Sequence, residues 1–173
     1  GAITTNNDAL AKKMRMYANH GRTSKYEHEF EGINSRIDGI QAAILNVKLK
    51  YLEDWTNKRR AIANYYLDKL SEVKEISLPV VDLKCNPVWH LFVIRVDERD
   101  NLKDYLLSKG ISVGVHYPIS LPNQPAYSSL NIKLEDFKVS NEQQNKLLSL
   151  PIFPELTEDK LDYICEEIKN YFK

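Results

Sequence analysis

The chain has 173 residues, which is enough for one hydrophobic core or for a modest domain with a piece of a second domain. Its 24 Lys and Arg residues balance its 24 Asp and Glu residues, so the overall charge predicts neither a nucleic-acid partner nor a membrane-surface partner. No apolar run approaches the roughly 20 residues of a membrane-spanning helix, and Gly1–Leu10 lacks the pattern of a signal peptide.

The N-terminal region predicts a strand end followed by a helix. Ala2–Thr5 is apolar and β-branched, which is typical of a strand, and a strand at this place needs neighbours from elsewhere. The polar run 6–8 can cap a helix over Ala9–Tyr17, which Gly21 then ends. Because the sequence also lacks an initial Met, we expect a processed or cut chain that belongs to something larger.

A long polar loop and a long helix follow. His20–Asn34 is polar, and a loop of this length inside a compact domain is more often functional than an ordinary turn. The spacing then predicts one helix from Arg36 to Leu70, with room for a bend. Near Trp55 the helix becomes heavily charged, so we place a domain boundary between residues 55 and 56. The first part of the helix shows the period of one buried face, at Ile37, Ile40, Ile44, Val47 and Tyr51.

The rest of the chain alternates strands and helices. Residues 120–137 are expected to be irregular, because this stretch is rich in proline and polar residues. A few strands with helices between them predict a small α+β layer. We expect strands at Ile76–Leu78, Trp89–Val96 and Ile111–Tyr117, and helices at Asp100–Lys109, Ser140–Leu148 and Thr157–Phe172.

Two groups of polar residues are candidates for a binding site. Asn34 and Arg36 would stand at the start of the long helix, where backbone N–H groups and the helix dipole favour an anion. The alternative is a helix cap and a solvated arginine. Tyr26 and His28 in the polar loop are ligand candidates, or else a surface aromatic and an idle imidazole.

The second group lies at the end of a predicted strand. His116 and Tyr117 directly precede Pro118, and strand ends commonly face clefts, although a satisfied core histidine is the alternative. His90, within a predicted apolar strand, is interpreted as structural. The sequence shows no zinc motif, Gly-rich phosphate loop or nucleophile–base pair, so no metal site is predicted. Cys85 and Cys165 are far apart, which predicts free thiols in a reducing compartment such as the cytoplasm.

Four segments, in order, resemble motifs of the DegT/DnrJ/EryC1/StrS sugar aminotransferases, which are fold-type I pyridoxal-phosphate enzymes. The segments are GAITTNNDALAKKMRMYANHG, GINSRIDGIQAAIL, GISVGVHYPISLPNQPAY and LLSLPIFPELTED, and they span nearly the whole chain. The resemblance implies that residues 1–55 are the C-terminal end of the large cofactor-binding domain. Residues 56–173 would be the small C-terminal α+β domain, a few-stranded antiparallel sheet with flanking helices, joined to the large domain by the long helix.

The resemblance also implies an activity for the intact enzyme. That activity is amino transfer from an amino acid, expected to be glutamate, to a keto-sugar nucleotide in a cytoplasmic homodimer with a shared active site. The family's Schiff-base lysine lies upstream of a segment like Gly1–Thr5, so no catalytic residue is expected in this chain and it should be inactive alone. Asn34 matches the residue that reaches the phosphate of the neighbouring subunit's pyridoxal phosphate.

The remaining candidates also match family motifs. The loop from Tyr26 through His28 to Arg36 would line the neighbouring subunit's site, and His116 and Tyr117 match the HYP motif near the sugar nucleotide. Two departures occur: Ile37 replaces a methionine, and Leu121, Pro122 and Asn123 stand where a histidine often precedes QPAY. The alternatives are a sugar 3-dehydratase of the same family, in which histidine replaces the lysine, and a non-catalytic dimerisation or regulatory domain.

Overall fold

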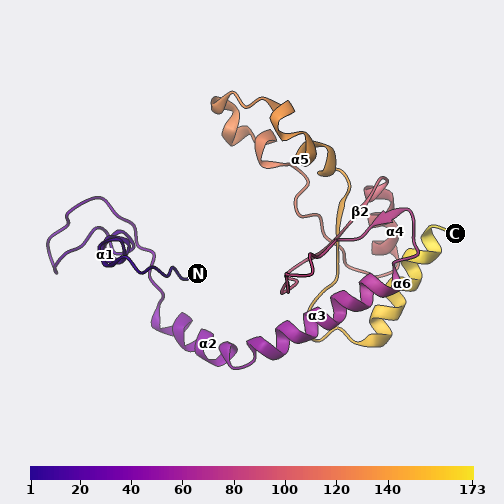
Figure 1. Cartoon of the computed structure of the whole chain (residues 1–173), viewed down its shortest axis with the longest axis horizontal. Helices are drawn as coiled ribbons and strands as arrows, with labels where there is room; N and C mark the ends of the chain where they lie inside the picture. The colour runs from indigo at the N-terminus through magenta and orange to yellow at the C-terminus, as the bar shows by residue number, and fades with distance from the viewer. The chain divides into compact units, whose positions relative to one another are not determined.

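The computed structural model describes residues 1–173, apart from the side chain of Leu134. The chain divides into two compact units, residues 1–51 and residues 52–173 (Figure 1). The boundary expected from the sequence, between residues 55 and 56, lies inside the first helix of the second unit, α3 (Leu52–Lys69). The assignment of the two units to a large and a small domain stays a prediction.

The first unit contains two helices and very little core. Helix α1 (Asp8–Tyr17) starts as predicted, with the Asn7 side chain accepting a hydrogen bond from the Leu10 amide at 3.0 Å. Met16 is the one hydrophobic side chain that is buried among the described residues of this unit. The strand predicted at Ala2–Thr5 is wrong for this chain, because none of the described residues pairs with that segment.

The long helix predicted from Arg36 to Leu70, with room for a bend, starts later and is divided into two helices. The structure has α2 (Gly39–Leu49) and α3, and the two are interrupted at Lys50 and Tyr51. The amides of these two residues reach back only three residues, to Val47 O at 3.3 Å and Lys48 O at 3.0 Å, so the regular ladder of the α-helix ends there. The buried face predicted for the first part of this long helix is wrong within this chain as well, because Ile37, Ile40, Ile44, Val47 and Tyr51 are all exposed.

The second unit is built on a three-stranded antiparallel sheet in the order β1 (Ile76–Ser77), β2 (Phe92–Val96) and β3 (Leu147–Leu150). Alternate residues of β2 are buried, at Phe92, Ile94 and Val96, as expected for a strand with one face on a core. Ile94 pairs with Leu148 of β3. The predicted α+β class with a few-stranded antiparallel sheet is confirmed.

Three helices complete this core. Helix α6 (Glu158–Tyr171) packs against α3 and against α4 (Arg99–Ser108) (Figure 1). The rings of Tyr66 and Trp89 lie 5.0 and 5.4 Å from the ring of Phe92, and the Tyr66 hydroxyl donates to Pro151 O at 2.9 Å. The helices contribute fully or almost fully buried side chains at Tyr66, Leu102, Leu106, Ile164 and Ile168, and Leu70, directly after α3, is fully buried as well.

Several predictions in the second unit need correction. Strand β2 begins at Phe92 rather than at residue 89, because Trp89 has a left-handed φ of 52° and turns the chain. His90 therefore lies outside the strand and is exposed, so it is not a core histidine. The strand predicted at Ile111–Tyr117 is wrong, since this segment meets β3 only through an isolated bridge between Gly114 and Ser149.

The helix predicted at Ser140–Leu148 is wrong too. Helix α5 (Lys138–Gln143) ends early, and the apolar run from Leu147 forms β3. A short apolar run fits a strand as well as a buried helix turn, and here pairing with β2 decides the outcome. Between Gly114 and α5 the chain forms three short 3-10 helices, η1 (Leu121–Asn123), η2 (Pro125–Leu130) and η3 (Leu134–Phe137).

Candidate functional site

The polar loop of the first unit is ordered by backbone hydrogen bonds to the end of α1. The carbonyls of Met16, Tyr17 and Ala18 accept from the amides of Gly21, Ile33 and Ser35 at 2.7, 2.8 and 2.9 Å. The last carbonyls of a helix have no partner inside the helix, so the returning loop satisfies them. The loop therefore holds its shape with almost no hydrophobic core beneath it.

Two glycines make this close return possible. Gly21 has a φ of +72°, and a Cβ placed there would lie 1.7 Å from Phe30 O. A Cβ on Gly32 would lie 2.4 Å from the Gly21 amide nitrogen and 2.6 Å from Tyr17 O. Because these neighbours are backbone atoms, they cannot move away as a side chain could, and both positions require glycine.

Side chains within the loop give it further order. Arg22 donates to the carbonyls of Ser24 and Lys25 at 3.2 and 2.7 Å. His28 Nδ1 lies 2.8 Å from His20 O, and because a carbonyl oxygen only accepts, Nδ1 is the donor of this hydrogen bond. Tyr26 is 80% exposed and has the Lys25 ammonium 5.1 Å from its ring centroid. The ring of Tyr26 is thus presented at the surface of the loop.

Asn34 and Arg36 contact each other directly. Arg36 Nε donates to Asn34 Oδ1 at 3.1 Å, and both residues are exposed. Their expected position at the start of a helix is wrong, because α2 begins only at Gly39 with Asp38 as its N-cap residue. The Asp38 amide donates to Gln41 Oε1 at 3.1 Å, and the Asp38 carboxylate occupies the place that the helix dipole would offer an anion. Any anion affinity of this pair must therefore come from the side chains themselves.

His116 in the second unit is anchored on strand β3. Its Nδ1 shares a hydrogen bond of 2.9 Å with Oγ of the buried Ser149, and the histidine is half-buried. Gly114 exchanges two backbone hydrogen bonds with Ser149, at 3.1 and 2.7 Å, and a Cβ on Gly114 would lie 2.8 Å from His116 Cε1. The imidazole therefore has a fixed orientation and a satisfied nitrogen.

Tyr117 has the opposite environment. It is 71% exposed, its ring lies edge-on to that of His116 at 5.5 Å, and it borders a cavity of about 870 Å³. Most of the cavity lining is apolar, and amide side chains lie at its border. The apolar lining includes Ile119, Leu121, Tyr127, Leu130, Ile132 and Phe137, and the amides are Gln124, Gln143 and Gln144.

Beside this cavity lies a polar network that sequence reasoning missed. Asn123 Nδ2 donates to Ser120 Oγ at 2.9 Å, to Asn141 Oδ1 at 2.8 Å and to Gln144 Oε1 at 3.3 Å. The Ser120 amide also donates to Gln144 Oε1, at 2.8 Å. The network joins η1 to α5. The sequence signal at this place was the departure at Leu121, Pro122 and Asn123, where a histidine often precedes QPAY.

Beyond the polar loop and the cavity beside Tyr117, the metal-ligating and thiol side chains of the described residues form no further candidate site. Among the described residues, no group of three His, Cys, Asp or Glu side chains could hold a metal ion. No helix among the described residues is long and apolar enough to cross a membrane either.

Cys85 and Cys165 are free, as predicted, and burial raises the pKa of the Cys165 thiol to about 12. Cys165 is therefore an unreactive core residue.

Comparisons with known proteins agree on one family. The model of the DegT/DnrJ/EryC1/StrS aminotransferase family matches residues 1–169. The chain is 42% identical over 171 residues to dTDP-3-amino-3,6-dideoxy-alpha-D-galactopyranose transaminase of Aneurinibacillus thermoaerophilus, covering 99% of this chain and 46% of that protein. It is 38% identical over 169 residues to the erythromycin biosynthesis sensory transduction protein EryC1 of Saccharopolyspora erythraea, and the match covers 98% of this chain and 46% of that protein.

A solved structure shows the same fold. S. venezuelae DesV, crystallised in complex with a ketimine intermediate, superimposes with a TM-score of 0.90 and 36% sequence identity. The match covers 97% of this chain and 45% of that chain. The chain thus spans less than half the length of the relatives it matches.

Proposed function

Because the chain belongs to the DegT/DnrJ/EryC1/StrS aminotransferase family, we propose that it is the C-terminal half of a pyridoxal-phosphate-dependent nucleotide-sugar aminotransferase. The observation that carries the proposal is 42% identity, over 99% of the chain, to a transaminase whose name includes a dTDP-linked amino sugar. The intact enzyme would be a homodimer that transfers an amino group from glutamate to a keto-sugar nucleotide.

The polar loop fits a role at the cofactor's phosphate. Since Oδ1 of Asn34 accepts from Arg36, the Nδ2 amide is the donor that Asn34 offers to an anion, and the Arg36 guanidinium adds positive charge beside it. Pyridoxal phosphate would supply the electron sink for amino transfer, and protein groups would bind and orient it. In the proposed homodimer Asn34 would bind the phosphate of the neighbouring subunit's cofactor, and Tyr26, His28 and Arg36 would line that site.

In the second unit we propose that Tyr117 contacts the sugar nucleotide and that His116 supports it. Tyr117 is exposed at the border of the large cavity, and its hydroxyl can donate to a phosphate or sugar oxygen. His116 is held by Ser149, and the edge-on contact of the two rings fixes the direction of Tyr117. The fixed geometry favours binding over proton transfer as the role of this pair.

The test is a reaction with the full-length protein. We expect glutamate and a dTDP- or UDP-linked keto sugar to give 2-oxoglutarate and the amino sugar, both measured by mass spectrometry. The 173-residue chain alone should show no turnover, and borohydride should fix pyridoxal phosphate to no single lysine of it. A product that loses a hydroxyl without gaining nitrogen would identify the 3-dehydratase, and turnover by the isolated chain would refute the proposal.

The name of EryC1 favours a second candidate, a regulatory protein on the same fold, because that relative is named for sensory transduction. A full-length protein that has a lysine at the upstream Schiff-base position, yet transfers no amino group to any keto-sugar nucleotide, would support this alternative.

A further inference from the structure

Tyr117 is exposed, yet the chain is held on both sides of it. On its N-terminal side, His116 Nδ1 shares a hydrogen bond of 2.9 Å with Oγ of the buried Ser149. On its C-terminal side, the amide of Ser120, three residues further along, donates to Gln144 Oε1 at 2.8 Å. The Tyr117 side chain, although 71% exposed, therefore projects from a short segment that is fastened at both ends.

The polar network behind the second contact has one consistent set of donors and acceptors. A backbone N–H only donates, so the Gln144 atom that faces the Ser120 amide is the side-chain oxygen. The Asn123 atom that lies 3.3 Å from this oxygen is then the donor Nδ2. Nδ2 also donates to Asn141 Oδ1 at 2.8 Å and to Ser120 Oγ at 2.9 Å. Asn123 is thus a donor that faces three oxygen atoms.

This network depends on the part of the chain that departs from the family. Leu121, Pro122 and Asn123 stand where a histidine often precedes QPAY. The asparagine is half-buried, and it lies outside the cavity lining that the described residues form. It therefore affects a ligand in the cavity through the segment that it holds. Gln144 borders the cavity, but its oxygen already accepts from two donors.

We propose that Asn123 and Gln144 are positioning residues that hold Tyr117 in place for the sugar nucleotide. Their role rests on the contact proposed between Tyr117 and that ligand. A side chain on a loose segment loses conformational freedom when it binds, whereas a segment that is already fastened avoids most of this cost. The two residues therefore strengthen binding of the sugar nucleotide and take no part in proton transfer.

Isosteric substitutions in the full-length protein separate the donor from the acceptor. Asn123→Asp, measured at about pH 8 where an aspartate is ionised, turns the donor into an oxygen that faces three other oxygens. It should raise KM for the sugar nucleotide about tenfold and change kcat by less than about twofold. Gln144→Leu removes the acceptor and should act in the same way.

Two further variants are the controls. Gln144→Glu keeps an oxygen that accepts from both donors, so it should leave KM for the sugar nucleotide within about twofold of the unsubstituted value. Because it adds the same negative charge as Asn123→Asp, it also controls for repulsion of the ligand's phosphates. Asn145→Asp makes the same chemical change as Asn123→Asp at an exposed neighbouring position, and it should change nothing.

A double-mutant cycle tests whether the effect passes through Tyr117. Binding of dTDP-glucose and UDP-glucose to the full-length protein, measured by calorimetry, reports affinity without turnover. Asn123→Asp should weaken binding of the tighter ligand about tenfold in the unsubstituted protein and less than about threefold in the Tyr117→Phe background. Equal losses in the two backgrounds would overturn the proposal. A lower Tm of Asn123→Asp with unchanged binding would overturn it as well, since the network would then serve the fold alone.

The positioning role and the proposed function fail in different ways. A full-length protein that binds a nucleotide sugar but transfers no amino group refutes the proposed function, and the cycle still decides the positioning role. Amino transfer with equal losses in the two backgrounds refutes the positioning role alone. If neither nucleotide sugar binds, Tyr117 has no such ligand to contact and the positioning role is refuted. If Asn123→Asp does not fold, Gln144→Leu takes its place in the cycle.

Discussion

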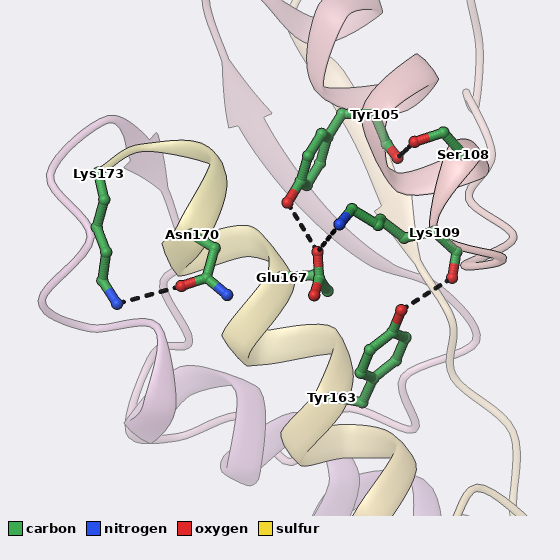
Figure 2. Close-up of polar contacts among 7 residues, drawn as sticks. All are labelled: Tyr105, Ser108, Lys109, Tyr163, Glu167, Asn170 and Lys173. Atoms are coloured by element: carbon green, nitrogen blue, oxygen red, sulfur yellow. Dashed lines mark hydrogen bonds and ion pairs between the residues drawn. The ribbon is translucent and has the colours of Figure 1, made fainter.

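The hydroxyl of Tyr105 in α4 donates to Glu167 Oε2 in α6 at 2.7 Å, and Lys109 Nζ lies 3.4 Å from the same oxygen (Figure 2). Tyr163 of α6 adds a hydrogen bond to Lys109 O at 3.1 Å. The hydrogen bond from Tyr105 holds the pKa of Glu167 below its ordinary value, and the hydrogen bond to Glu167 raises the pKa of Lys109. These contacts fasten the two helices at the edge of the core.

A pH dependence follows from the lowered pKa of Glu167. A carboxylate whose pKa is lower in the folded than in the unfolded protein stabilises the fold at pH values above its unfolded pKa. That stabilisation is lost as the pH falls through its folded-state pKa. Glu167→Gln should therefore lower Tm at pH 7, and the difference from the unsubstituted protein should shrink once the pH is well below about 4. Glu166→Gln removes the same charge at an exposed neighbour and is the control. A Tm difference that is constant with pH would contradict the assignment.

The two glycines of the polar loop should not tolerate a methyl group. Gly21→Ala places alanine in the left-handed region and against Phe30 O, which costs about 1–3 kcal/mol in strain alone. Gly32→Ala should act similarly, because the Cβ would meet backbone atoms. Hydrogen exchange at the Ile33 and Ser35 amides of the full-length protein measures the loss of loop order. Gly39→Ala is the matched control, since a Cβ there meets no described atom within 4 Å.

Asn34→Ala in the full-length enzyme should weaken retention of pyridoxal phosphate. The phosphate would lose a charge-assisted hydrogen bond worth roughly 1.5–3 kcal/mol, which is about a tenfold to hundredfold change in the dissociation constant. Because the contact is proposed between subunits, mixing this variant with a subunit that lacks the Schiff-base lysine should restore part of the activity. Mixed dimers that recover nothing would argue against a shared site.

Tyr117→Phe and His116→Ala should separate binding from anchoring. Tyr117→Phe should raise KM for the sugar nucleotide more than KM for the amino donor and leave Tm unchanged, because the hydroxyl is exposed. His116→Ala should raise the same KM and also cost about 1–3 kcal/mol of stability, because buried Ser149 loses its partner. A lowered Tm with unchanged sugar-nucleotide kinetics in the histidine variant would make its role purely structural.

The helices that were well predicted are those with a strong end signal. Asn7 caps α1, Thr157 precedes α6, and Gly110 ends the α4 region with a left-handed φ of +74°. Such signals are local, so they can be read without knowing the fold. The errors fall on apolar segments whose neighbours decide their structure: the run at Leu147 becomes a strand only because β2 lies beside it.

The sequence supplied the candidate residues of the site, whose roles stay predictions, but it did not supply their geometry. The family motifs identified Asn34, Arg36, His116 and Tyr117 as candidates. The sequence analysis did not recognise Asp38 as the N-cap residue of α2, and therefore placed the start of the helix too early. The anchoring of His116 also depends on Ser149, which is 33 residues away in the sequence. The network around Asn123 joins residues from two separate elements. Contacts over such separations have no local pattern.

The packing of Trp89 on Phe92 has a practical consequence for spectroscopy. The chain has two tryptophans, Trp55 and Trp89, and both belong to the second unit. Intrinsic indole fluorescence will therefore report mainly the melting of residues 52–173, because residues 1–51, which contain the polar loop and α2, have no tryptophan. A denaturation curve recorded by this emission can therefore look fully cooperative although the polar loop that carries Asn34, the candidate phosphate-binding residue, has already unfolded.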